Sequence, residues 1–303
     1  MSATSTPEAS FGSRTRSYVP WIAGLAAALV ISLILAVTFG AEPVSLGRAA
    51  LDAASLDHLI VFKARLPRVA LAAIAGAGLA VSGASLQALL RNPLAEPYLL
   101  GVSGGAALGA TLAILLGISG LTLLGAALLP LAALAGGFLA TVIVYALARS
   151  AGSISGTEIL LAGIIVNAVA AALVTFAKTL ATAPRTQELL FWLVGFVDVP
   201  APAALVAVSF YVTLGAGALW LDAARLNLLA LGEEPAMHLG VDVRRLIRRV
   251  FFASSLLVGA IVSVTGLIGF VGLVVPHVAR RFVGPDLRIV LPVCLLGGAT
   301  ALV

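Results

Sequence analysis

The chain has 303 residues, of which 61% are hydrophobic and 10% are charged, and its formal net charge is +5. A soluble domain carries about 25% charged residues, so this composition excludes a protein that is surrounded mainly by water. The single cysteine, Cys294, excludes an intrachain disulfide and a cysteine-based metal cluster.

Continuous apolar stretches recur along the whole chain, and a helix needs about 20 apolar residues to cross a bilayer. Because the stretches are continuous rather than alternating, they argue against a transmembrane β-barrel. The sequence predicts an all-α polytopic membrane protein. We expect its spans at roughly 20–40, 66–90, 98–116, 121–148, 158–181, 200–221 and 246–267, with a short one at 274–283 and a last one from 288 onward.

The N-terminal residues 1–19 form a polar tail, and residues 20–303 form the membrane domain. The apolar stretch from Trp21 is too long for a typical signal peptide, so we expect it to be the first span. If the tail is cytoplasmic and each stretch crosses once, 12 of the 18 lysines and arginines fall on the cytoplasmic side. Such a bias sets orientation. It predicts a multi-pass protein whose N-terminus is cytoplasmic, and it explains the pI near 10 without nucleic-acid binding.

The stretch from Arg91 to Gly105 is unusually polar for its surroundings, and its Gly101–Gly104 piece (GVSG) looks like the motif of an intramembrane serine protease. Such an enzyme needs a histidine base within hydrogen-bond reach of Ser103, and only His277 could approach it. We favour a turn between two spans, with Ser103 and its glycines at a helix start. No catalytic residue and no metal ligand is therefore expected.

If this membrane protein is a transporter, a possibility that the internal repeat described below supports, its energy source is not visible in the chain itself. There is no phosphate-binding GxxxxGK[ST] loop, and no ionisable residue falls deep within a span, where ion-coupled carriers usually hold one. Glu158 lies near a span end, and with Ser155 it forms a capping-box pattern that starts a helix. We expect the energy to come from a partner, and an ion-coupled secondary transporter is the alternative.

The most charged part of the chain is residues 222–249. Two short amphipathic helices are expected around 225–231 and 233–239, broken by Gly232 and ended by Gly240. A helix lying along the membrane surface could dock into a groove of another protein. The alternative is a solvated loop whose arginines face lipid phosphates.

An internal repeat appears when the chain is shifted against itself by 183 residues, with nine identities in 37 positions. The first copy would run inward and the second outward, as in the inverted repeats of transporters. The repeat halves would cover about 60–182 and 243–303. General similarity among apolar helices is the alternative explanation. The shared skeleton pairs Gly76 with Gly259, Gly83 with Gly266, Pro93 with Pro276 and Gly101 with Gly284.

Five motifs in order resemble the FecCD family of ABC importer permeases: RLPR at 65–68, NPLAEP at 92–97, GVSGG at 101–105, LGEEPAMHLG at 231–240 and GLIGFVGLVVPHVARR at 266–281. The resemblance covers about residues 60–303. It implies ten spans, and the printed chain ends within the ninth that we expect. It also implies transport of haem, a ferric siderophore or cobalamin by alternating access.

The resemblance further implies a homodimer of permeases, two cytoplasmic ATPase subunits and a periplasmic substrate-binding protein. ATP and Mg²⁺ would bind to the ATPases, and no cofactor is expected in this chain. Arg65 and Arg68 would pair with acidic residues of the binding protein, since guanidinium grips a carboxylate bidentately. Anchoring to lipid headgroups is the other interpretation of these two arginines.

Two further sets of residues follow from the resemblance. The cytoplasmic gate would comprise Asn92, Leu94, Ser153 and Ser155. The segment seated on the ATPase would comprise Leu231, Gly232, Glu233, His238, Leu239 and Gly240, with Glu233 as its polar contact. Residues 187–196 resemble a short outer helix of the family near the dimer axis, and Lys178 and Arg185 just before it could attract an anionic cargo.

Overall fold

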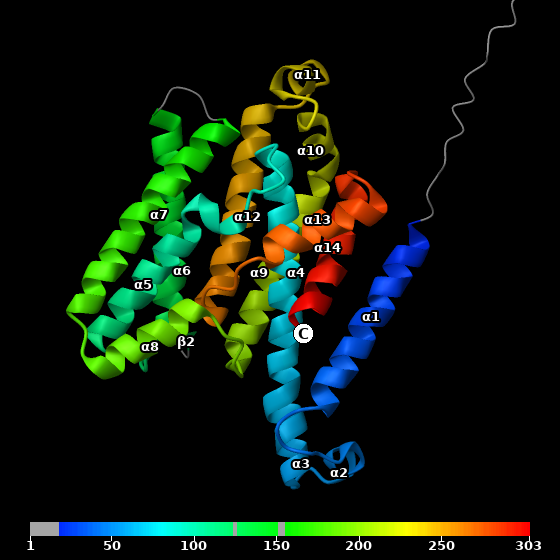
Figure 1. The fold of residues 1–303 in the computed structure, drawn as a ribbon, viewed down its shortest axis with the longest axis vertical. Helices are drawn as coiled ribbons and strands as arrows, with labels where there is room; N and C mark the ends of the chain where they lie inside the picture. The colour runs from blue at the N-terminus through cyan, green and yellow to red at the C-terminus, as the bar shows by residue number, and fades with distance from the viewer. Residues whose placement is uncertain (1–17, 124–125, 151–154) are drawn as a thin grey trace, which may run out of the picture.

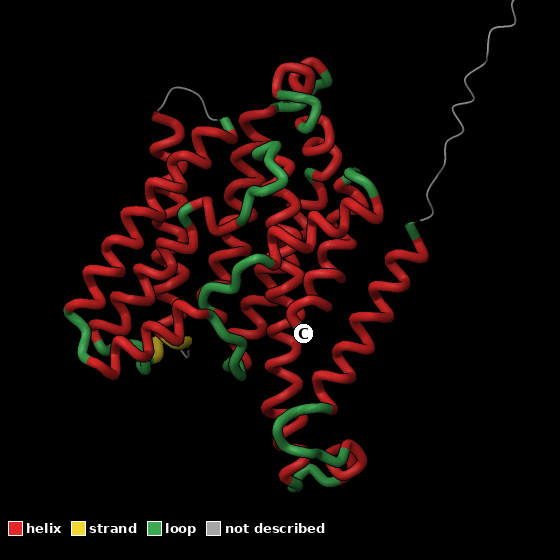
Figure 2. Tube along the Cα trace, in the orientation of Figure 1, coloured by secondary structure: helices red, strands yellow, loops and turns green. Residues whose placement is uncertain are grey.

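The computed structural model describes residues 18–123, 126–150 and 155–303. These residues form a helical bundle with one small two-stranded turn, shown in yellow in Figure 2. Among them, six helical stretches are long and apolar enough to cross a membrane. The fold is therefore all-α and polytopic, as the composition predicts. The ten-span count stays a prediction.

The first half of the bundle begins with α1 (Val19–Thr38), which stands beside α14 at the edge of the molecule (Figure 1). A turn of two short helices, α2 (Leu46–Leu51) and α3 (Leu56–His58), leads through a π-helical segment η1 (Leu59–Arg65) into α4 (Leu66–Leu89). The next elements are η2 (Pro97–Leu100), α5 (Val102–Leu116), β1 (Thr122–Leu123), β2 (Ala126–Ala127), α6 (Leu128–Ser150) and α7 (Gly156–Thr179).

The second half begins with α8 (Ala183–Val194), a short helix that overlaps residues 187–196, where the resemblance implies one. A long helix, α9 (Pro202–Leu221), returns to the other end of the bundle. The remaining elements are α10 (Ala223–Leu229), α11 (Glu233–His238), α12 (Val243–Thr265), α13 (Val271–Val283) and α14 (Leu287–Leu302).

Two expected spans are wrong in their boundaries. The span expected at 98–116 is interrupted at Gly101, whose φ of 86° lies in the left-handed region that glycine tolerates. A 3₁₀ turn precedes it and a regular helix follows it. The span expected at 121–148 starts only at Leu128, because residues 122–123 and 126–127 form two antiparallel strands. Both stretches are apolar throughout, so hydropathy alone did not reveal the breaks.

The central helix is α4, which is almost fully buried and packs against α9, α12, α13 and α14. Lipid tails are as apolar as side chains, so close van der Waals packing between small residues drives helix association in a membrane. A Cβ atom on Gly76 would meet the backbone of Gly298 at less than 3 Å, and one on Gly83 would meet Gly272. These glycines therefore let α4 pack closely against α14 and α13.

The helix pair α5 and α6 packs in the same way. A Cβ on Gly105 would clash with the carbonyl group of Gly136, and one on Gly109 would clash with that of Ala132. This second contact holds the side of the bundle that is drawn in green in Figure 1.

The inverted repeat stays a prediction. Helices α4 and α12 run in opposite directions (Figure 1), as an inverted repeat requires. The local structures diverge further on, however. Gly83 lies inside α4 whereas Gly266 ends α12, and Pro93 lies in a turn whereas Pro276 lies inside α13.

The bundle has two distinct ends. At the upper end of Figure 1 lie the turn at 90–96, α10, α11 and the start of α12. At the lower end lie α2, α3, η1, the β turn and α8. The elements that carry the predicted cytoplasmic and outer cations are thereby separated. Which end faces the cytoplasm remains a prediction.

Candidate functional site

The segment that follows α9 consists of two short helices, as predicted. The helix α10 ends at Leu229, and Gly232 then has a φ of 123° before α11 begins at Glu233. The helix α11 is followed by Gly240, whose φ is 84°. Both angles are accessible to glycine at little cost. Gly232 and Gly240 therefore set the length of α11 and its direction relative to α10.

The helix α10 is fastened to α12 through a buried carboxylate. The side chain of Asp222 is only 7% exposed, and its Oδ1 accepts hydrogen bonds from Arg225 (2.6 Å) and from Arg249 on α12 (2.9 Å). Removing one partner of a buried ion pair leaves a charge uncompensated, which is strongly unfavourable. The start of α10 is thus held firmly to the first turns of α12.

A second anchor joins α10 to the start of α14. Asn227 donates from Nδ2 to Asp286 Oδ1 (2.7 Å) and accepts at Oδ1 from the backbone N–H of Leu287 (3.0 Å). Asp286 also accepts two hydrogen bonds at 2.7 and 3.0 Å from the Arg288 side chain. Hydrogen bonds from Arg288, and a smaller one from Asn227, lower the pKa of Asp286 to about 2.

The helix α11 presents an apolar surface at this end of the bundle. Leu231, Met237 and Leu239 are 66%, 56% and 58% exposed, whereas Ala236 is buried against the rest of the chain. The predicted residues His238 and Gly240 are also exposed. Exposed apolar groups that gather at one place mark an interaction surface. We refer to Leu231, Met237 and Leu239 as the α11 patch.

Glu233 contacts the chain's own turn at the end of α4. Its carboxylate lies 3.8 Å from the guanidinium of Arg91, and the two side chains are 36% and 49% exposed. Arg91 itself has a φ of 50°, which is uncommon outside glycine. The structure therefore places the residue predicted as the polar contact to a partner beside the predicted gate.

Three of the predicted gate residues, Asn92, Leu94 and Ser155, are described in the structure. Asn92 Oδ1 accepts from the N–H of Leu94 (2.9 Å), which closes the turn, and Leu94 is 71% exposed. Ser155 and Glu158 form the predicted capping box at the start of α7. The neighbouring Gly156 packs on the end of α4 at Leu89. Ser153 lies outside the described residues, and gating itself is not tested.

A polar cluster that the sequence analysis missed connects the turn to two helix breaks. Glu96 Oε1 accepts from the N–H of Phe270 (2.9 Å), just before α13, and the Tyr98 hydroxyl donates to the Ile268 carbonyl. Asn167, inside α7, donates to the Tyr98 carbonyl (2.7 Å) and accepts from the Gly104 N–H (3.1 Å). Backbone groups within a membrane need such partners. The sequence feature that could have indicated this cluster is Asn167, the one asparagine in an otherwise largely apolar helix.

The helix α13 is also fastened to α4. Arg280 donates to the Gln87 side chain and to the Ala84 carbonyl (3.2 Å). Gln87 in turn donates to the carbonyls of Gly272 and Leu273, both at 3.4 Å. This polar contact lies next to the close approach of Gly83 and Gly272, so α13 is held along most of its length.

The serine protease interpretation has no geometric support. Ser103 is buried, and its hydroxyl has no hydrogen-bond partner among the described residues, His277 included. Ser103 also makes no cap: the residue before α5 is Gly101, and no side chain caps that helix. Among the residues that the structure describes, no group of three or more His, Cys, Asp or Glu side chains is arranged to hold a metal ion.

The basic residues of the opposite end bind helix termini. Arg65 donates to the carbonyls of Val37 (3.0 Å) and Thr38 (2.9 Å), at the end of α1. Arg185 donates to the carbonyl of Leu115 (2.7 Å), at the end of α5. Cations at helix C-termini interact favourably with the helix dipole. Arg68 is exposed, and no ion pair to it is seen within the described ranges.

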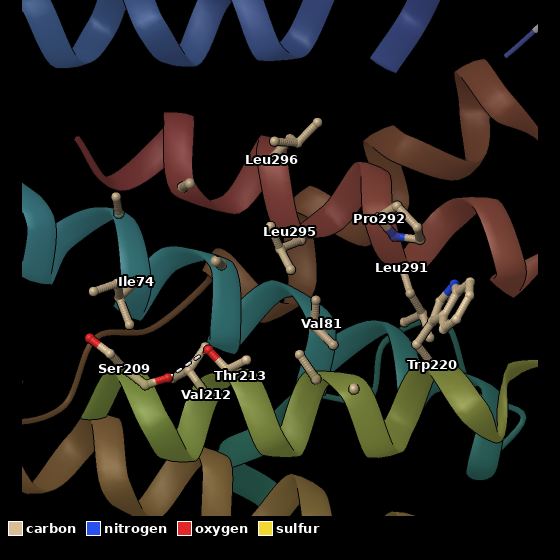
Figure 3. A pocket seen from close by; sticks show the side chains of 15 residues that line it. Ile74, Val81, Ser209, Val212, Thr213, Trp220, Leu291, Pro292, Leu295 and Leu296 are labelled. Atoms are coloured by element: carbon tan, nitrogen blue, oxygen red, sulfur yellow. Dashed lines mark hydrogen bonds between the residues drawn. The ribbon is translucent and has the colours of Figure 1, made fainter. Parts of the chain in front are cut away.

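A groove on the bundle lies away from these residues. It measures about 590 Å³ and lies between α4, α9 and α14. Figure 3 shows it lined by Ile74 and Val81, by leucines of α14 and by Ser209 and Thr213. The two hydroxyls donate to carbonyls of their own helix at 2.6 and 2.8 Å. The groove surface is therefore almost entirely apolar.

Comparisons with known proteins identify similar chains. The family model of the FecCD transport family matches residues 28–303. The chain is 38% identical to the hemin transport system permease protein HmuU of Yersinia pestis over 238 residues, 78% of this chain and 71% of the relative. It is 36% identical to the vitamin B12 import system permease protein BtuC of Shigella boydii over 290 residues, 95% of this chain and 85% of the relative.

A solved structure is also similar. It is described as an inward-facing conformation of a metal-chelate type ABC transporter. The TM-score is 0.81 at 33% sequence identity, and the match covers 94% of this chain and 88% of that one.

Proposed function

Because the chain belongs to the FecCD transport family and is a permease of an ABC importer, we propose that it moves haem, a ferric siderophore or cobalamin from the periplasm to the cytoplasm. The names of the relatives support this class of cargo: one is named for hemin and another for vitamin B12. We propose alternating access as the mechanism, with ATP hydrolysed by two partner subunits. The permease would act as a homodimer in the bacterial inner membrane.

The observation that carries this proposal is the α11 patch. Three large apolar side chains are exposed at the end of the bundle where α10 is fastened to α12 and α14. A docked ATPase could cover the patch, and the two anchors of α10 would pass its movement to the bundle. The sequence contains no phosphate-binding loop of its own, which agrees with hydrolysis in a separate subunit.

The opposite end would receive the periplasmic binding protein. We propose that Arg68 supplies the main charge contact there, because its side chain is exposed. Arg65 would contribute less directly, since its guanidinium already holds the end of α1. The turn containing Asn92 and Leu94, together with Ser153 and Ser155, would form the cytoplasmic gate.

The proposal is tested by reconstituting the chain with a candidate ATPase and a candidate binding protein from the same genome. Hemin, ferrichrome and cyanocobalamin serve as separate cargo probes in liposomes. We expect uptake of at least one probe only with ATP at the ATPase side, and no uptake when the Walker lysine of the ATPase is replaced. A protonophore should have no effect. Uptake that persists without the ATPase and collapses with a protonophore would instead establish the ion-coupled transporter.

A further inference from the structure

The turn after α4 contacts both α11, at one end of the molecule, and the break between α12 and α13, inside the bundle. We refer to residues 91–98 as the strap. At its start Arg91 faces Glu233 on α11, and at its end Glu96 and Tyr98 bind the backbone at 268–270. A short stretch of chain therefore spans the distance between the α11 patch and the break between α12 and α13.

The contacts that α10 and α11 make with the rest of the chain differ in how easily they can be released. Asp222 is buried between two arginines, and Asn227 makes reciprocal hydrogen bonds at the start of α14. The Arg91–Glu233 pair is partly exposed and 3.8 Å long. An exposed pair of this kind shifts an equilibrium by no more than about fivefold. Gly232, with its φ of 123°, separates the firmly held α10 from α11.

The strap is well fastened at its other end. Glu96 accepts from the N–H of Phe270, and Phe270 has a φ of 67°, which a bulky residue rarely adopts. Tyr98 donates to Ile268, and Asn167 holds the Tyr98 carbonyl. The Glu96 carboxylate lies at the N-terminal end of α13, where negative charge is favourable. Displacing the strap would therefore disturb the unusual backbone that starts α13.

We propose that the Arg91–Glu233 pair is a releasable link through which docking on α11 acts on the strap, and that Glu96 passes the displacement to the start of α13. Arg91 and Glu96 are then positioning residues for transport. This inference rests on the proposed function, because it takes α11 as the ATPase contact. It gives Glu233 an intramolecular partner in addition to the role predicted from the resemblance.

The link itself is tested in the full chain in nanodiscs, without any partner, by hydrogen–deuterium exchange. We expect Arg91→Glu and Glu233→Arg each to raise amide exchange at 268–273 by about two- to fivefold, the range of an exposed ion pair. The double variant, in which the charges are swapped, should return to the wild-type rate. Glu96→Gln should raise exchange of the same amides in every Arg91 and Glu233 background.

Arg245→Glu is the matched control. Arg245 pairs with Asp242 at 3.3 Å at the same end of the molecule, and both side chains are more than half exposed. Its substitution should leave exchange at 268–273 unchanged. Unchanged exchange in Arg91→Glu or Glu233→Arg, or a charge swap that fails to restore it, would overturn the link.

A second measurement separates the link from a purely structural contact. In complexes with the ATPase, cargo moved per ATP hydrolysed should fall in each single charge reversal and recover in the charge swap. If no ATPase binds the wild-type chain, the proposed function fails while the exchange experiment still reports on the link. If the ATPase binds and the ratio is unaffected by both single reversals, the link has no part in transport.

Discussion

Three carboxylates at the α11 end of the molecule, those of Asp222, Glu233 and Asp286, are held with different firmness because their surroundings differ. Asp222 is buried and compensated by two guanidinium groups, whereas Glu233 is partly exposed and has one cation at 3.8 Å. Asp286 lies between these extremes, with a bidentate arginine and an asparagine. Burial of the carboxylate and the number of its hydrogen-bond donors, rather than the residue type, decide how firmly each of these contacts is held.

The pH dependence of stability should show the contribution of Asp286. Its folded-state pKa is about 2, below the ordinary value of 3.8. Because the pKa is lowered on folding, the carboxylate stabilises the protein above about pH 4, and this contribution is lost as the pH falls towards 2. Thermal unfolding in detergent from pH 2 to 5 measures it. Asp286→Asn should be less stable than wild type at pH 5 and should approach it near pH 2.

A constant difference between Asp286→Asn and wild type across that range would contradict the assignment.

At the level of elements, small residues determine how the helices approach one another. The contacts α4–α14, α4–α13 and α5–α6 each bring glycines against the backbone of the neighbouring helix. Polar side chains then cover the backbone groups that the breaks at 97–101 and 266–270 leave without helical partners. Irregular backbone at membrane depth is tolerated only where it is buried in this way.

Substitution of Gly83 should destabilise the bundle. A Cβ there would come closer than 3 Å to the Gly272 backbone, which cannot move aside as a flexible side chain could. Gly83→Ala should therefore cost about 2–3 kcal/mol of unfolding free energy, the scale of overpacking. Unfolding in mixed micelles of mild detergent and dodecyl sulfate measures the difference.

The matched control is Gly217→Ala on α9. Gly217 is also a helical glycine, but no atom lies within 4 Å of the position of its Cβ. Alanine is favoured over glycine in a helix interior by about 1 kcal/mol, so this variant should be unchanged or slightly more stable. Equal effects of the two substitutions would argue against backbone contact as the cause.

The two surfaces that we propose as docking sites lie at opposite ends of the molecule. One end carries the α11 patch and the turn with Asn92, and the other carries Arg68, α2, α3 and α8. The central helix α4 runs from one end to the other and contacts most of the other long helices. A displacement at one end therefore has a packed route to the other.

The orientation in the membrane can be measured with cysteine labelling. In a Cys294→Ala background, Gly240→Cys at the α11 end and Asp52→Cys beside α2 place single thiols at opposite ends of the bundle. In intact cells an impermeant maleimide should label Asp52→Cys and should spare Gly240→Cys until the membrane is opened. The reverse labelling pattern would show that the N-terminal tail is outside.

The sequence alone determined the class of the protein, its spans to within a few residues for most helices, and the two helices on either side of Gly232. These features follow from local properties: apolar length, glycine conformation and capping side chains. The capping box of Ser155 and Glu158 is of the same kind. The order of the five motifs also indicated the family that the comparisons now show.

Only the tertiary structure decided the partners of the polar residues. The predicted contacts of Glu233 and Arg65 with other proteins stay predictions, and the structure gives each residue a partner within the chain: Glu233 faces Arg91, and Arg65 holds the end of α1. No role followed from the sequence for Glu96 or Asn167, whose partners lie 174 and up to 69 positions away. Hydropathy and propensity report on near neighbours in the chain. Partners that distant are set by how the helices pack, because each break in a helix must find its hydrogen bonds wherever folding brings them.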